Sequence, residues 1–185
     1  PLEGLKKRVN IVIKGNKIHR MGNSQELKLS PKNKIIDGSN KYLIPGLWDS
    51  HVHFYFDRQL ALHMPELFLS TGITSVRDTG GEFHYLDSIR QNALSHPKTH
   101  PRVKIAGPLI DGNFNVYNGS VLPELSIRTR NVSESIAETE KLVARGVDFL
   151  KAYEMLSPEQ FEAIAAIAAR ENLRLAGHVP LSMEI

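Results

Sequence analysis

The sequence contains no cysteine, which excludes disulfide cross-links, cysteine-ligated metal sites and thiol catalysis. No apolar run approaches the roughly 18 residues that a membrane-spanning helix needs, so no membrane segment is predicted. The chain begins with Pro1 rather than Met, which leaves the cellular compartment open. Aromatic residues are scarce at 7%, but a hydrophobic content of 41% and a charged content of 23% are ordinary for a globular protein.

Positive charge is concentrated near the N-terminus. Residues 1–46 hold ten Lys or Arg and three Asp or Glu, a net charge of +7, whereas the remainder holds thirteen and seventeen, a net charge of −4. A basic segment can bind nucleic acid. These cations are instead scattered among short apolar stretches with few aromatic rings between them. We therefore predict the solvated face of a small β element and no nucleic-acid partner.

The pattern of elements changes near residue 45. Residues 9–13, 17–21 and 34–36 are β-rich and are separated by Gly, Asn and Asp, which is typical of hairpins. From there on, strands alternate with helical patterns. The expected strands are 42–53, 73–77, 103–106, 147–153 and 173–178, and the expected helices are 58–70, 83–94, one capped by Ser133 and one that begins with a capping box at Ser157. Residues 107–130 are expected to form one long loop of the kind that often carries function.

Such alternation predicts an α/β fold with a parallel sheet, either a barrel or a doubly wound sheet. A doubly wound nucleotide site would place a glycine-rich fingerprint after its first strand. The first strand here ends in His51-Val52-His53 without that fingerprint, which favours the barrel.

His51 and His53 are the first candidates for chemistry. Alternate residues of a strand point to the same face, so these imidazoles lie on one face about 7 Å apart along the chain. Neutral imidazoles can bind one divalent metal, and Asp49 shares their face. Two histidines at a wet strand end would look the same in sequence. The position at the carboxyl end of the first strand favours the metal, because barrel active sites lie at that end.

Lys151 and His178 lie near the ends of two later strands, and each has an ordinary alternative. Lys151 could extend past the strand end into solvent, and His178 could be buried and bonded to the main chain. Four residues that suit a metal site at one rim are hard to explain by packing. Arg77 and Tyr153 are candidates for substrate contact, with an Arg77–Asp78 ion pair and packing of Tyr153 as the alternatives.

Four segments resemble strands of one known family. Ile44–His53, Thr71–Gly81, Phe149–Tyr153 and Ala176–Pro180 are similar to strands one, two, four and five of the amidohydrolase superfamily, in its imidazolonepropionase-related, Xaa-Pro-dipeptidase-like branch. The resemblance implies a (β/α)₈ TIM barrel flanked by a small β-sandwich domain. It also implies a hydrolase that cleaves carbon–nitrogen bonds in a small-molecule amide, dipeptide or cyclic amide.

The resemblance further implies one or two divalent metals, usually Zn²⁺. By this reading His51 and His53 hold the first metal and His178 holds the second. Lys151 carries a carbamate derived from CO₂ that bridges both metals. Lys151 and His178 would then serve catalysis as well as metal binding, through a metal-activated water.

The length leads to a further expectation. Residues 45–185 number 141, whereas a complete barrel takes about 250. We therefore expect residues 1–44 to be a partial sandwich domain and 45–185 to be the first five strands of a truncated barrel, inactive when isolated. The alternative is a non-catalytic half-barrel that binds a metal or a partner, and its open sheet edge leaves a homo-oligomer open.

Overall fold

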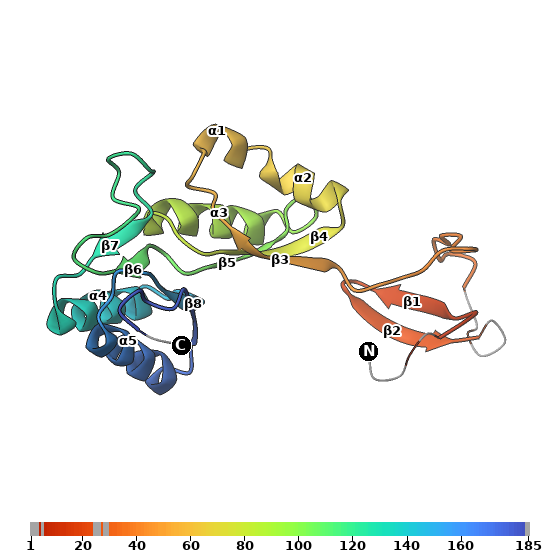
Figure 1. Cartoon of the computed structure of the whole chain (residues 1–185). Coiled ribbons are helices and arrows are strands. Elements are labelled where there is room, and N and C mark those ends of the chain that lie inside the picture. The colour runs from red at the N-terminus through yellow and green to blue at the C-terminus, as the bar shows by residue number, and fades with distance from the viewer. Residues whose placement is uncertain (1–3, 5, 24–26, 28–29, 184–185) are drawn as a thin grey trace. The chain divides into compact units, whose positions relative to one another are not determined.

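The computed structural model describes residues 4, 6–23, 27 and 30–183 (Figure 1). The chain divides into two compact units, residues 1–44 and residues 45–185. Across these described ranges, every helix is too short or too polar to cross a membrane.

The described part of the first unit is built around one hairpin. Strands β1 (Asn10–Lys14) and β2 (Lys17–Gly22) are antiparallel, and the turn between them places Gly15 at φ +64°. The first two predicted strands are therefore confirmed. The third, residues 34–36, is wrong, because these residues form no strand with any described residue. A turn ends at Asn33 and another begins at Asp37, whose carboxylate accepts a hydrogen bond from the Ser39 amide at 2.9 Å.

In the second unit, strands alternate with helices except for the run β5, β6 and β7, which has no helix between its strands (Figure 1). In chain order the elements are β3 (Leu47–Val52), α1 (Arg58–Ala61), α2 (Met64–Ser70), β4 (Ile73–Asp78), α3 (Phe83–Ser95), β5 (Arg102–Ile105), β6 (Leu109–Asp111), β7 (Ser126–Arg128), α4 (Val132–Ala144), β8 (Phe149–Ala152), α5 (Pro158–Arg170) and β9 (Arg174–Gly177). All strand pairs described in this unit are parallel, in the orders β3-β4-β5 and β7-β6-β8-β9. The predicted parallel α/β architecture is confirmed.

The two sheets adjoin one another. Only three residues separate β5 from β6, and the Asp148 amide, just before β8, donates to the Ile105 carbonyl at 2.9 Å. Because the strands are parallel, their carboxyl ends lie along one edge. Helix α2 packs on β4, α3 on β5, α4 on β6, and α5 on β8 and β9. Val76, Ile105, Leu150 and Ile164 are fully buried in the core that results.

Three local predictions need correction. The expected loop 107–130 contains β6 and β7, which are three residues each and too short to show a period. The expected helix 58–70 is two helices, since Asp57 caps α1 and Pro65 occupies the first turn of α2. Helix α4 is capped by Asn131 rather than Ser133. The capping box of Ser157 at the start of α5 is confirmed.

Candidate metal centre

His51 and His53 converge at the carboxyl end of β3. Their Nε2 atoms lie 3.2 Å apart. His53 Nδ1 lies 2.9 Å from the Gly80 carbonyl oxygen, which can only accept, so Nδ1 carries the proton and Nε2 the lone pair. Two imidazole nitrogens on one tetrahedral zinc, at the usual bond length, are separated by about 3.3 Å. The spacing of the pair therefore fits two ligands of one metal ion.

The surroundings of both histidines favour the neutral form that a metal requires. Burial lowers the pKa of His51, and the charges of Lys151, His53, His178 and Arg77 lower it further. Burial also lowers the pKa of His53, and Lys151 adds to the effect, although the bond to Gly80 opposes it. These shared effects show that Lys151 and His178 lie within electrostatic range of His51.

Lys151 lies within β8 and is only 5% exposed. Its ammonium group forms no hydrogen bond or ion pair with any described residue. Burial lowers the pKa of Lys151, and the Arg77 guanidinium lowers it further. Partial desolvation without an acceptor or a counter-ion disfavours the cation, so the surroundings shift the proton equilibrium of Lys151 toward the neutral, nucleophilic amine.

His178 follows directly after β9 and is held by a carboxylate. Its Nδ1 lies 2.6 Å from Glu154 Oε1, so Nδ1–H donates to Glu154, and in the neutral imidazole the lone pair is on Nε2. The Tyr153 ring packs against the imidazole with 4.5 Å between centroids. Our reading of the sequence missed Glu154, although an acidic residue directly after the predicted strand was a usable signal.

Arg77 lies at the end of β4, and Tyr153 directly follows β8. Arg77 Nε donates to the Ser50 carbonyl at 3.1 Å, and its guanidinium lies 4.7 Å from the centroid of the Phe149 ring. The alternative of an Arg77–Asp78 ion pair is not what the structure shows. Tyr153 is 8% exposed, and burial raises its pKa. Contact of either side chain with substrate stays a prediction.

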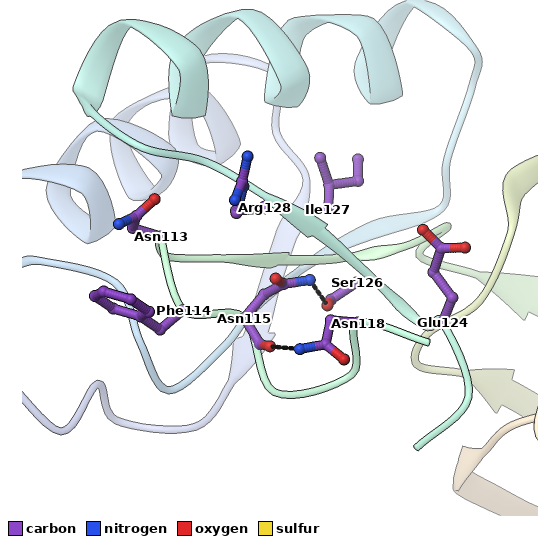
Figure 2. Close-up of a pocket in the computed structure, with 8 residues that line it drawn as sticks. All are labelled: Asn113, Phe114, Asn115, Asn118, Glu124, Ser126, Ile127 and Arg128. Atoms are coloured by element: carbon purple, nitrogen blue, oxygen red, sulfur yellow. Dashed lines mark hydrogen bonds between the residues drawn. The ribbon is translucent and has the colours of Figure 1, made fainter. Parts of the chain in front are cut away.

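In the described part of the chain, no group of three or more His, Cys, Asp and Glu side chains is close enough to hold one metal ion. What the structure offers is the pair of imidazoles, with Lys151 and His178 nearby. A separate cavity of about 580 Å³ is lined by β7 and by five residues of the connection between β6 and β7, namely Asn113, Phe114, Asn115, Asn118 and Glu124 (Figure 2). Asn115 Nδ2 donates a hydrogen bond to Ser126 Oγ at 2.8 Å, and both residues line the cavity. None of the predicted site residues lines this cavity.

Comparison with known proteins supports the fold. No family model matches the chain. One curated relative is the 5-methylthioadenosine/S-adenosylhomocysteine deaminase of Carboxydothermus hydrogenoformans, with 48% identity over 44 aligned residues. The aligned stretch covers 24% of this chain and 10% of the deaminase. Among solved structures, similar chains are an amidohydrolase (TM-score 0.76, 20% identity), a Xaa-Pro dipeptidase with bound methionine (0.70, 20%) and molinate hydrolase (0.77, 17%).

These three matches cover 93%, 92% and 93% of this chain and 51%, 52% and 49% of the respective solved chains. The chain thus spans about half the length of the solved structures it matches. The resemblance to the amidohydrolase superfamily is confirmed at the level of the fold.

Proposed function

We propose, on the premise of an amidohydrolase fold, that the protein carrying this chain is a metal-dependent hydrolase of carbon–nitrogen bonds. Its substrates would be small-molecule amides, dipeptides or cyclic amides. The observation that carries the proposal is the 3.2 Å separation of His51 Nε2 and His53 Nε2 at the carboxyl end of a parallel strand. Lys151, which has no hydrogen-bond or ion-pair partner among the described residues, lies within electrostatic range of His51.

His51 and His53 would hold one Zn²⁺ and His178 a second, and Lys151 would contribute an anionic ligand as a carbamate. Bound zinc supplies a Lewis acid for the substrate carbonyl and a water of lowered pKa. The other steps belong to the chain itself. The Gly80 carbonyl fixes the tautomer of His53, and Glu154 fixes that of His178, so that both Nε2 lone pairs are available.

Lys151 is prepared for carboxylation by its surroundings. The neutral amine would attack the carbon of CO₂, form a new N–C bond and release one proton, which leaves a carbamate with a single negative charge. Burial and the neighbouring Arg77 both lower the pKa of Lys151, which makes the neutral amine easier to reach than in a free lysine. The anionic product would face the Arg77 guanidinium, which converts a repulsion into an attraction.

The test is zinc titration and amide hydrolysis in the whole protein that carries this sequence. We expect His53→Ala and Lys151→Met each to abolish zinc-dependent hydrolysis and weaken zinc binding. His84→Ala is the matched control, because His84 is an exposed histidine on α3, outside the candidate centre. Protein equilibrated with ¹³C-bicarbonate should show a carbamate signal that the Lys151→Met variant lacks.

Two outcomes would count against the proposal. Unchanged zinc affinity and turnover in the His53→Ala variant would refute the assignment of the metal centre. Tight zinc binding without hydrolysis of any amide or dipeptide would instead favour a non-catalytic, metal-binding protein.

A further inference from the structure

Asp78 is a fully buried carboxylate at the end of β4. Its Oδ2 accepts a hydrogen bond from the Phe54 amide at 2.7 Å, and its Oδ1 accepts one from the Gly80 amide at 3.0 Å. Phe54 directly follows His53, and the Gly80 carbonyl accepts from the His53 ring. One carboxylate therefore fixes the main chain at both points that define where the His53 imidazole lies.

Asp111 repeats this arrangement at the end of β6, and it is also fully buried. Its Oδ1 accepts from the amides of Gly112 at 2.9 Å and Met155 at 2.8 Å. Its Oδ2 accepts from the Val116 amide at 3.0 Å. Met155 directly follows Glu154, the residue that holds His178. The second carboxylate thus fixes the loop that orients the second candidate histidine.

Neither aspartate has a cationic partner among the described residues. Asp148 differs from these two aspartates. It directly precedes β8, at the amino end of that strand, and forms ion pairs with Arg90 and Lys104. Burial of an uncompensated carboxylate costs several kcal/mol, and charge-assisted bonds from amides offset part of that cost. Each such carboxylate reaches from its own strand to the loop that follows a neighbouring strand. Both loops lead to the candidate metal centre.

We infer that Asp78 and Asp111 are positioning residues, which act through main-chain amides on His53 and on the Glu154–His178 pair respectively. The expected effect of these aspartates on zinc binding rests on the proposed function. The positions of the two imidazoles do not depend on it, so the two ideas can fail separately.

The experiment compares Asp78→Asn and Asp111→Asn in the whole protein. Asparagine keeps the shape, but its amide group faces an N–H donor and breaks at least one bond. In the metal-free protein, Asp78→Asn should shift or broaden the NMR signal of the His53 Nδ1 proton and leave that of His178 unchanged. Asp111→Asn should do the reverse. Each variant should also bind zinc about 10–100-fold more weakly.

Thr139→Val is the matched control. Thr139 is fully buried in α4 and donates to the Ser135 carbonyl at 2.6 Å, away from both loops. It should lose stability without moving either imidazole signal. Unchanged imidazole signals in both aspartate variants would overturn the inference. A wild-type protein that binds no zinc would refute the proposed function, while the imidazole signals would still decide the positioning roles.

A measurement on the wild-type protein covers the case in which the variants do not fold. The inference requires slow hydrogen exchange at the amides of Phe54 and Met155, although neither lies in a helix or strand. Exchange of these two amides at the rate of an open loop would overturn it.

Discussion

The buried carboxyl of Asp78 makes the stability of the protein depend on pH in a direction that can be worked out. Burial raises the pKa of Asp78 to about 7 from an ordinary value of 3.8, against the two amide hydrogen bonds that lower it. The folded chain therefore holds this proton more tightly than the unfolded chain. The free energy of unfolding contributed by Asp78 should fall as the pH rises from about 4 to about 7 and remain level above that. At about 1.4 kcal/mol for each tenfold change in proton affinity, the fall is about 4 kcal/mol.

The assay is urea unfolding of the metal-free wild-type protein and of Asp78→Asn, at a series of pH values from 4 to 8. At any one pH, the difference in the free energy of unfolding between the two proteins includes the hydrogen bond that the asparagine loses. This loss is the same at every pH, so it does not contribute to the change of the difference with pH. We expect Asp78→Asn to gain about 4 kcal/mol relative to the wild type across the series. The lowered pKa values of His51 and His53 act in the opposite direction below about pH 6.5. Because Asp78 positions His53, both proteins are compared with His53→Ala in the background.

Parallel curves would refute this reasoning. If the difference between the two proteins is constant within about 1 kcal/mol, the two amide donors balance the effect of burial, and Asp78 has the same pKa in the folded and unfolded chain. A difference that grows in favour of the wild type as the pH rises would mean that the folded protein lowers the pKa of Asp78.

Three further predictions concern single positions. A Cβ at Gly112 would lie 1.7 Å from the Met155 carbonyl oxygen, so Gly112→Ala should lower the free energy of unfolding by about 3 kcal/mol or more in urea titrations. Ser157→Ala removes the N-cap of α5 and should cost about 1 kcal/mol, measured in the same way. Glu154→Gln should weaken zinc binding about 10-fold while the urea midpoint changes little, because His178 loses its charged partner.

Features set by neighbours in the sequence could be predicted from the sequence. The capping box of Ser157 involves residues three apart, and the shared face of His51 and His53 requires only that two residues lie in one strand. The actual cap of α4 is also a local feature. Asn131, two residues before Ser133, accepts a hydrogen bond from the Glu134 amide through its side chain. Asn131 and Ser133 are both residue types that cap helices well, so the sequence indicates a cap here but does not decide between the two.

Features set by the order of strands could not be predicted in the same way. Strands β6 and β7 are three residues each, and they exist because each finds a parallel partner far along the chain. The bond between Glu154 and His178 spans 24 residues, and the bond between Asp111 and Met155 spans 44. Alternation of strands and helices predicts which ends share an edge, but not which side chains meet there.

The two buried aspartates nevertheless share a local pattern that links sequence to site. Each ends a parallel strand, and each is followed within two residues by a closely approached glycine. Gly80 is approached by the side chains of Leu109 and His53, and Gly112 by the loop that holds Met155. A Cβ at Gly80 would lie 2.8 Å from Leu109 Cγ and 3.2 Å from His53 Cε1, and one at Gly112 would strike the Met155 carbonyl. The carboxylate needs exposed amide hydrogens within reach, and the glycine lets the neighbouring loop come near enough to supply them. A strand-terminal Asp with a following Gly is therefore a physical signal for a loop held in place beside the carboxyl edge of a parallel sheet, the edge at which parallel α/β sheets bind their ligands.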